Sequence, residues 1–475
     1  MQLWSAACGG CGGACLEEGK VNTALKVNER LDLFFDLVSR DAFVVDMPSQ
    51  SRKRIPGPVL SEPDIWIAQS TALVTRGSTG QNDHPGLQVT PRQPWREPLF
   101  LWLYVTVAVS LLLRISIFNF ESGDFRLYLS HWYDWFIEHG RWRGLGKLTE
   151  QFANYPPLYM YFVSLSTLLP LPKLYAIKLI SIGSDYVVAA YVWRLLQREF
   201  PKNQRAWVAI TIFLFLPTVV MNGALWAQCD VIYVGGFVAS LSYLLENRPR
   251  AALIAFGLSC SLKPQAIFWC PLLAGLFVSG RLPWKWIWIP GAVYAACGIP
   301  AMLAGRPVLD VLAYWGRVEN TPGLTLGATN WYQWVFEQYP EIFWWPGVVL
   351  TLGATAVFVL WMNENRAKQS DQNRWLVSLA LLSVLFPPFL LPGMHERYFF
   401  AADVLSVIYA FYVAGGWRVT ALVQTASAFT YLPYLFSKEV IPRTLLPLAI
   451  VVALVLVVRD LVQGSKTDGK QEKRA

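Results

Sequence analysis

The chain has 475 residues, of which 54% are hydrophobic and 15% are charged, and its formal net charge is +8. So apolar a composition excludes an ordinary soluble domain and is typical of a polytopic membrane protein. The positive charge needs no nucleic-acid partner, because most Lys and Arg lie in short loops and tails, where the positive-inside rule places them.

Residues 1–95 have no sustained apolar period and contain several Pro, Ser and Gly. This composition predicts a poorly ordered cytoplasmic extension without a functional site, and Met47 is an alternative start. The CGGCGGAC run at 8–15 lacks the second Cys or His cluster that a zinc site needs, so no metal is expected there. The membrane domain is expected over 96–462, followed by a charged cytoplasmic tail at 463–475.

Apolar segments recur through the membrane domain and predict an all-α fold, a polytopic transmembrane helical bundle of about 12 spans. The expected spans are 98–118, 174–194, 206–222, 229–246, 251–262, 266–279, 286–303, 342–362, 375–392, 397–414, 419–436 and 443–460. Segment 158–169 would be only about 18 Å long as a helix, against about 30 Å for a bilayer core, so a surface or re-entrant helix is expected. Segment 251–278 holds Lys263 and Pro264 in its middle, which predicts two short spans that meet at the non-cytoplasmic face.

The charges of the loops support this topology. If segment 158–169 lies at the surface or is re-entrant and segment 251–278 forms two short spans, four basic loops and the C-terminal tail face the cytoplasm. The cations of these loops are Arg194, Arg198, Lys202 and Arg205; Arg248 and Arg250; Arg281 and Lys285; and Arg366, Lys368 and Arg374. The basic stretch 141–147 is an exception, because it is expected outside.

A polar stretch, 118–157, follows the first span. It cannot cross a bilayer, because each of its charges would cost about 2.5–3.5 kcal/mol near the midplane. Four apolar side chains recur on one helical face and predict an interface helix directly after Asp124: Phe125, Leu129, Trp132 and Phe136. Asp124 is therefore the candidate catalytic base, held at the membrane surface; the alternative is that it only caps this helix.

Four polar clusters converge on the outer face in this topology. They are Asp124; Trp226, Gln228 and Asp230; Lys263 and Gln265; and His395, Glu396 and Arg397. A loop over 304–341 joins them with Arg317, Glu319, Asn330, Trp331 and Trp334. The loops of the cytoplasmic face are basic and have no comparable mixed clusters.

Acidic, basic and aromatic groups at one membrane face suit a lipid-linked phosphosugar. Lys and Arg bind the phosphate, and transfer to a hydroxyl needs a carboxylate that takes its proton. Each cluster also has a structural alternative: Asp230 as a helix cap, Lys263 reaching the headgroups, and His395 with Arg397 bridging loops. Two acids inside spans, Asp185 and Asp403, are either functional or structurally hydrogen-bonded.

The order of these elements carries a family resemblance. The elements are Asp124, the Asn154-Tyr155-Pro156-Pro157-Leu158 run, Ser184-Asp185, the Trp226-x-Gln-x-Asp230 turn, Lys263-x-Gln265 and His395-Glu396-Arg397. Over about residues 97–460 this order resembles the GT-C superfamily of polyprenyl-phosphate-sugar-dependent glycosyltransferases. The YPPL and HER elements look most like the dolichyl-phosphate-glucose glucosyltransferases. The hydropathy layout is similar to bacterial mannosyltransferases related to the second glycosylphosphatidylinositol mannosyltransferase.

The resemblance implies a hexosyltransferase, mannose being the favoured sugar, that inverts the transferred centre without a cofactor or an obligatory metal. It implies that Asp124 is the base and that the donor phosphate lies near His395 and Arg397. Tyr155 and the other cluster residues would bind substrate, and the acceptor would be a lipid, glycan or protein hydroxyl. The family usually has Gly before the Gln of the turn, where this chain has Ala227.

Two other classes of function are compatible with the sequence. A transporter or flippase of a lipid-linked sugar is favoured by Lys263 in a broken segment, although the chain shows no obvious internal repeat. A non-catalytic scaffold of cell-envelope assembly would not need a carboxylate beside basic and aromatic groups. For the enzyme, the expected location is the plasma membrane of a bacterium, with the active site on the outer face.

Overall fold

The computed structural model describes residues 98–148, 155–201, 204–312, 314, 323–335, 340–366 and 371–472. These residues are mostly helical, and their only sheet is one parallel pair of two-residue strands, β1 (Thr325–Leu326) and β2 (Met394–His395). The expected all-α class is therefore confirmed. The extension 1–95 lies outside the described residues, as do Asn154, Arg317 and Glu319.

The apolar segments of the sequence coincide with helices or with consecutive pairs of helices. The first half contains α2 (Pro98–Ser116), α3 (Ser130–Glu138), α4 (Arg141–Lys147), α5 (Pro157–Ser166), α6 (Lys173–Glu199), α7 (Arg205–Phe215), α8 (Pro217–Val220), α9 (Asp230–Leu245) and α10 (Pro249–Cys260). The second half contains α11 (Cys270–Val278), α12 (Ile289–Leu303), α13 (Val308–Leu312), α14 (Pro340–Asn365), α15 (Gln372–Leu390), α16 (Phe400–Tyr412), α17 (Trp417–Phe436) and α18 (Leu446–Glu472).

Six helices of the described residues are long and apolar enough to cross a membrane: α2, α6, α12 with its preceding turn, α14, α15 and α18. A seventh would be the pair formed by α7 and the segment Pro217–Leu225, which is bent by 49°. Helices α9, α10 and α16 are apolar but shorter, and the 16 residues of α9 span only about 24 Å. The architecture is that of a polytopic membrane protein, and the count of about 12 spans stays a prediction because it needs the short helices to cross.

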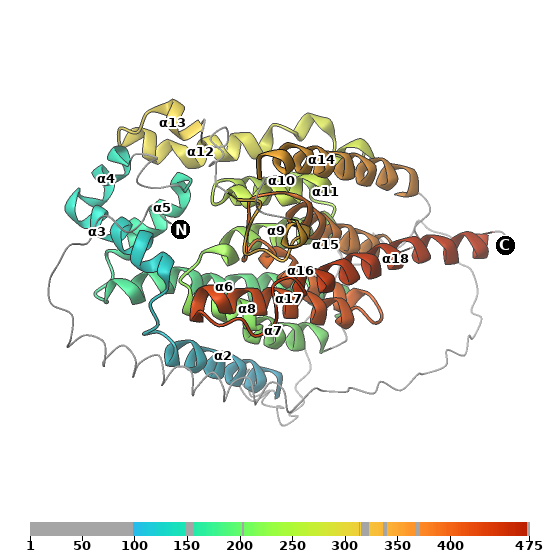
Figure 1. Ribbon diagram of the computed structural model, residues 1–475, viewed down its shortest axis with the longest axis horizontal. Coiled ribbons are helices and arrows are strands. Elements are labelled where there is room, and N and C mark those ends of the chain that lie inside the picture. Colours follow the sequence, from blue (N-terminus) through green and yellow to red (C-terminus); the bar gives the residue numbers. More distant parts are fainter. Residues whose placement is uncertain are drawn as a thin grey trace, which may run out of the picture. The chain divides into compact units, whose positions relative to one another are not determined.

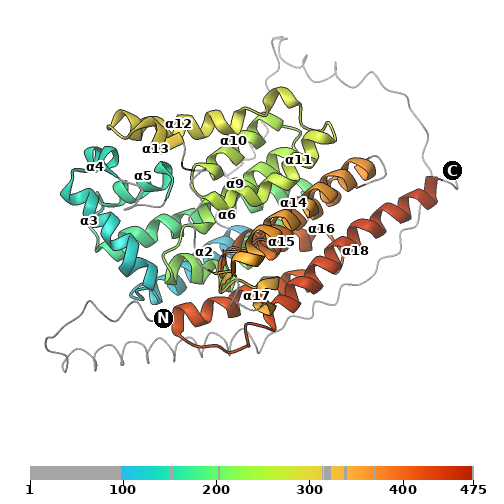
Figure 2. The same cartoon turned by 45° about the horizontal axis from the view of Figure 1, so that its top comes forward.

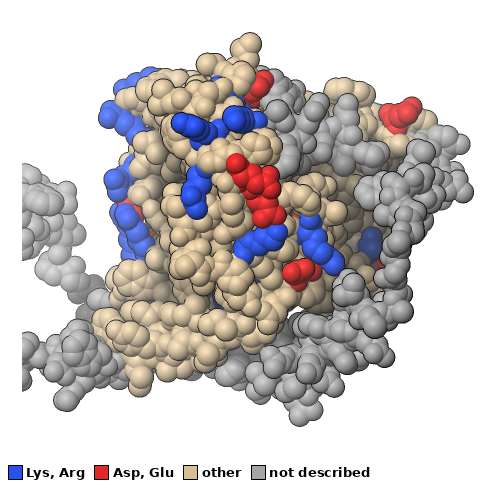
Figure 3. Space-filling view, turned by 90° about the vertical axis from the view of Figure 1, so that its left-hand side faces the viewer, with Lys and Arg blue, Asp and Glu red and all other residues tan. Residues whose placement is uncertain are grey.

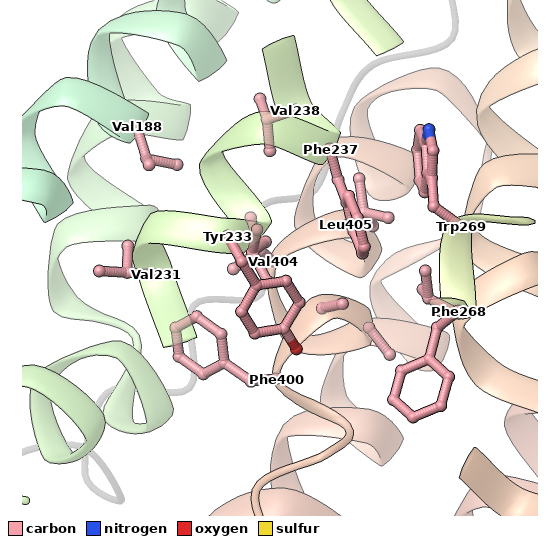
Figure 4. Packing of buried hydrophobic residues seen from close by; sticks show 14 of the residues in the cluster. Val188, Val231, Tyr233, Phe237, Val238, Phe268, Trp269, Phe400, Val404 and Leu405 are labelled. Carbon is pink, nitrogen blue, oxygen red and sulfur yellow. The ribbon is translucent and has the colours of Figure 1, made fainter. Parts of the chain in front are cut away.

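The core lies around α9, which contacts α6, α10, α15 and α16. Phe237 of α9 stacks on Trp269 with ring centroids 4.7 Å apart, and side chains of α16 complete this packing (Figure 4). Helices α3, α4 and α5 gather at one end of the domain, against α6 and α12 (Figure 1). Figure 2 shows α17 and α18 beside α15 and α16, which agrees with the contacts among these four helices.

Three local features match the elements expected from the sequence, while their placement relative to a membrane stays a prediction. The segment 158–169 contains only the ten-residue helix α5. The chain breaks at Lys263, between the end of α10 and the 3₁₀ turn η4 (Pro264–Trp269). A helix does follow Asp124, as the π-helical turn η2 (Phe125–Leu129) and then α3, and its four predicted apolar side chains are buried. That face packs inside the protein, because α3 lies on α5 and α6.

A buried ion pair ties α2 to α6. Arg114 donates from Nη2 and Nε to Asp185 Oδ2 at 2.9 and 3.0 Å, and both side chains are 1% exposed. Arg114 Nη1 also donates to the carbonyl of Leu214 on α7. These contacts support the structural interpretation of Asp185. Asp403 is likewise fully buried, on α16 beside Thr218 and Ser427.

We expect Asp185→Leu to lower the free energy of unfolding by about 3–5 kcal/mol, because it leaves the Arg114 guanidinium buried without its anion. The double variant Asp185→Leu/Arg114→Met should recover much of this loss. The matched control is Lys173→Met, since Lys173 pairs with Asp134 at 2.8 Å but both side chains are nearly half exposed; its cost should stay below about 1 kcal/mol. Denaturation of the purified variants in detergent measures all three, and equal losses for Asp185→Leu and Lys173→Met would contradict the expectation.

Candidate active site

Asp124 lies in the turn between α2 and η2, and its side chain is not a helix cap. The Phe125 N–H donates instead to Ser122 Oγ at 3.1 Å, and Asp124 makes no capping hydrogen bond. The capping interpretation of Asp124 is therefore wrong, because Ser122 performs that role. The carboxylate of Asp124 is left to make contacts with other parts of the chain.

Four side chains from distant segments hold the Asp124 carboxylate. Trp226 Nε1 donates to Oδ2 at 3.0 Å, and the amide of Gln228 donates to the same oxygen. The Tyr434 hydroxyl donates to Oδ1, and Arg397 Nη1 lies 3.5 Å from Oδ2. The side chain of Asp124 remains 14% exposed. The result is a carboxylate of fixed orientation that keeps limited access to solvent.

Trp226 and Gln228 reach one carboxylate because the backbone reverses between them. Ala227 has φ of +64°, in the left-handed region, where a side chain costs about 1–2 kcal/mol. Hydrogen bonds from two neighbouring segments hold this turn: Ser122 Oγ donates to the Trp226 carbonyl at 2.7 Å, and Ser181 Oγ donates to the Gln228 carbonyl. Ala227 thus occupies a backbone conformation that favours glycine.

Asp230 and Lys263 form a second, more deeply buried part of the site. Lys263 Nζ donates to Asp230 Oδ1, and the two side chains are 3% and 1% exposed. Asn222 Nδ2 donates to the other oxygen of Asp230 at 2.8 Å, and Arg397 Nε lies 3.7 Å from it. Asp230 makes no capping hydrogen bond at the start of α9, so its cap interpretation is also wrong.

Arg397 connects the two carboxylates. It lies 5.4 Å above the ring of Trp226, and its Nε has no hydrogen-bond partner among the described residues. Burial lowers the pKa of Arg397, but Asp124, Tyr155 and Asp230 raise it, and the net pKa lies well above its usual value. Two cations, Arg397 and Lys263, thus face three carboxylates, those of Asp124, Asp230 and Glu396.

Aromatic groups line the same space. Trp226 and Tyr434 stack with centroids 4.6 Å apart. The Tyr155 hydroxyl donates to Gln228 Oε1 at 3.4 Å, and Lys263 Nζ lies 5.5 Å from the Tyr155 ring centroid. Burial raises the pKa of Tyr155 well above its usual value, so its hydroxyl keeps its proton at neutral pH. The Trp226 ring is fully buried between Tyr434 and Arg397, so these aromatic groups enclose the charged network.

The His395-Glu396-Arg397 segment enters the site from the strand β2, whose partner β1 belongs to the predicted fifth loop. Glu396 is buried, and its Oε1 lies 3.5 Å from Arg397 Nη1. His395 is 32% exposed, with Nδ1 3.8 Å from Glu396 Oε2. Gln265 is buried, and its Oε1 has no hydrogen-bond partner among the described residues. Arg397 contacts Asp124 directly, whereas His395 and Gln265 form no hydrogen bond or ion pair with it.

The described residues of the fifth loop make hydrogen bonds that support the site, whereas its predicted charges, Arg317 and Glu319, lie outside the described residues. Asn330 and Trp331 donate to the carbonyls of Leu391 and Leu390, at 3.4 and 3.3 Å. Trp334 Nε1 donates to the Thr444 carbonyl at 2.7 Å. The bonds of Asn330 and Trp331 fix the segment that leads from α15 into His395.

Sequence reasoning did not find several residues of the site. Tyr434 and Asn222 contact the two carboxylates directly, and Ser122 and Ser181 hold the turn. Lys178 is fully buried on α6 and donates to the carbonyls of Phe118 and Phe120, at 2.8 and 2.6 Å. No periodicity or charge run marks these residues, and only Lys178, a cation within an apolar segment, carried a signal that could have been noticed.

The basic stretch 141–147 belongs to the end of the domain seen in Figure 3, where Lys and Arg side chains gather in several groups. Arg141, Arg143 and Lys147 of α4 are exposed. Arg141 has a structural role, because its Nε donates to Thr167 Oγ1 at 2.8 Å and its Nη2 donates to the Thr167 carbonyl at the end of α5. The positive-inside rule does not explain basic residues in 141–147, a stretch expected outside. The contact with Thr167 gives a structural reason for one of them, Arg141.

Comparison of the chain with models of known protein families and with curated proteins gave no match. The class that the fold and the site define is a helical membrane protein with a charged, largely buried site at one end of its helices. Within the described residues, no group of three or more His, Cys, Asp or Glu is placed to hold a metal ion.

The conformation of Ala227 leads to a prediction on stability. Ala227→Gly should leave the free energy of unfolding within about 1 kcal/mol of the unchanged protein, because relief of the left-handed strain offsets the lost methyl group. The matched control is Ala224→Gly, at an equally buried but helical position, which should lose about 0.5–1 kcal/mol or more. Thermal unfolding in detergent compares the two, and a larger loss at 227 than at 224 would contradict the argument.

Proposed function

We propose that the protein is an integral-membrane glycosyltransferase that moves a hexose, with mannose the proposed sugar, from a polyprenyl-phosphate donor to a hydroxyl acceptor. The observation that carries the proposal is the Asp124 carboxylate, partly exposed, oriented by Trp226, Gln228 and Tyr434, and 3.5 Å from the Arg397 guanidinium. A base and a phosphate-binding cation side by side are what transfer from a phosphosugar to a hydroxyl requires.

In the proposed reaction the acceptor hydroxyl gives its proton to Asp124 as its oxygen attacks the anomeric carbon. The bond from that carbon to the phosphate oxygen breaks, and the polyprenyl phosphate leaves with the electron pair. Arg397 stabilises the negative charge that grows on the phosphate, and its unpartnered Nε offers a donor for it. Because the nucleophile enters opposite to the leaving group, a single displacement inverts the anomeric centre.

The remaining charged residues have supporting roles in this proposal. Lys263 is already paired with Asp230 and almost fully buried, so it acts on the donor phosphate by holding Asp230 and Gln228 rather than by direct contact. His395, more exposed than Arg397, is placed to meet the part of the donor nearer the solvent. The outer face of a bacterial plasma membrane is the proposed location, from the distribution of basic loops.

A transporter of the same lipid-linked sugar is the second candidate. Discontinuous helices favour it, since the chain breaks at Lys263 and bends by 49° between α7 and the Pro217–Leu225 segment. Reconstitution in vesicles with labelled polyprenyl-phosphate mannose separates the two functions. Transbilayer movement of the label without a new glycosidic product would support transport, and a new product would support transfer.

The first test is Asp124→Asn, which keeps the size of the side chain and removes the base. Transfer of label from polyprenyl-phosphate mannose to the acceptors in membranes that contain the variant should fall by about 10²–10⁴-fold. Asp134→Asn is the matched control, because Asp134 lies on helix α3 and, among the described residues, pairs with Lys173 away from the site; it should transfer at a near-normal rate. Near-normal transfer by Asp124→Asn would remove Asp124 as the base and leave Asp230 as the candidate.

The second test concerns the donor phosphate. Arg397→Lys keeps the positive charge beside Asp124 and Asp230 but loses the planar guanidinium that matches phosphate oxygens. The KM for the donor should rise by about tenfold or more, the effect of losing one charge-assisted hydrogen bond, while the KM for the acceptor stays nearly constant. Steady-state kinetics with each substrate varied in turn measures both, and a rise confined to the acceptor KM would show that Arg397 does not serve the donor.

A further inference from the structure

A second polar space lies at the end of the helices opposite the candidate active site. It is a cavity of about 250 Å³. Its lining comes from the ends of α6 and α9, the start of α15 and the end of α16: Leu195, Arg198, Glu199, Ser242, Leu245, Asn373 and Tyr412. Asp230 begins α9 whereas Leu245 ends it, so the length of this helix, about 24 Å, separates the cavity from the site.

The cavity presents one cation and one anion. Arg198 is 58% exposed, and its Nη1 lies 3.2 Å from Glu246 Oε1. Glu199, the next residue, accepts a hydrogen bond from Asn373 Nδ2 at 2.8 Å. Opposite charges on consecutive residues at the end of α6 give the cavity a dipolar lining.

The guanidinium of Arg198 is not neutralised by Glu246. Arg194 and Arg248 contact the same carboxylate, at 2.9 and 3.4 Å. Three guanidinium groups therefore share one carboxylate, and the cluster keeps an excess of positive charge beside the cavity. Arg198 can bind a further anion, because a guanidinium has five N–H donors.

The Tyr412 side chain lines the cavity and carries a hydroxyl group that can donate a further hydrogen bond. Tyr412 Oη is buried and has no hydrogen-bond partner among the described residues. Its ring is held in place by Phe200, with centroids 5.5 Å apart. A buried hydroxyl that makes no hydrogen bond costs about 1–3 kcal/mol, so a polar occupant of the cavity would stabilise the protein.

From these contacts we infer that the cavity binds the headgroup of a zwitterionic phospholipid with a primary ammonium group. The phosphate contacts Arg198, the ammonium contacts Glu199, and the Tyr412 hydroxyl hydrogen-bonds the headgroup. The volume lies below the roughly 300–1,000 Å³ of pockets for whole small molecules, which suits a headgroup whose acyl chains remain outside. A lipid is the natural occupant because α6 and α15, whose ends line the cavity, are both long enough to cross a membrane.

Native mass spectrometry of the purified full-length protein tests the inference, with palmitoyl-oleoyl phosphatidylethanolamine and palmitoyl-oleoyl phosphatidylglycerol added separately to the detergent solution. The unchanged protein should retain the ethanolamine lipid more strongly. Glu199→Gln should weaken retention of the ethanolamine lipid about tenfold without weakening the glycerol lipid, because only the former has an ammonium group. Arg198→Gln should weaken both lipids, since both have the phosphate.

Two further variants keep the test decisive. Arg194→Gln is the matched control, because Arg194 contacts the same Glu246 but does not line the cavity; it should leave lipid retention unchanged. Tyr412→Phe is nearly isosteric and should weaken retention of the ethanolamine lipid even if a charge variant fails to fold. Equal retention of both lipids by the unchanged protein would overturn the zwitterionic assignment. Retention that is indifferent to Arg198→Gln and to Tyr412→Phe would overturn the site itself.

Discussion

Charge balance in a space with little solvent is the constraint on which this structure depends. Asp124, Asp230, Lys263 and Arg397 form the ion pairs of this space, with Glu396 also beside Arg397. Removal of either cation would leave a buried carboxylate without its closest cation, at a cost of several kcal/mol. The four residues come from four separate segments. Correct pairing therefore requires that the turn after α2, the start of α9, the break after α10 and the segment before α16 meet at one place.

The short helices follow from this requirement. Helices α9 and α10 have 16 and 12 residues, less than the roughly 20 that a bilayer core needs. Their ends carry Asp230 and Lys263 into the domain, where the long helix α6 and the core around Phe237 surround them. A longer α10 would continue through Lys263 and Pro264, and proline cannot supply the N–H that such a helix requires. The break at Lys263 thus ends helix α10 and also positions the Lys263 ammonium group beside Asp230.

The sequence allowed prediction of the charged residues but not of the groups that hold them. Asp124, Asp230, Lys263 and Arg397 could be recognised because charges at the ends of apolar segments are costly and therefore informative. Tyr434 could not, since it contacts Asp124 across 310 positions and a tyrosine near the end of an apolar helix is common. The capping interpretation of Asp124 failed for a local reason: Ser122, two residues earlier, accepts the same kind of N–H bond.

The backbone at Ala227 connects the fold with the proposed chemistry. Side chains two positions apart on an extended chain point the same way but along parallel lines, whereas Trp226 and Gln228 both donate to Asp124 Oδ2. A positive φ at the residue between them makes the two side chains converge. The energy of that conformation is supplied by the hydrogen bonds of Ser122 and Ser181 to the flanking carbonyls. Strain of this kind persists only where the surroundings hold it, and here it orients Asp124, which is more exposed than the carboxylates of Asp230 and Glu396.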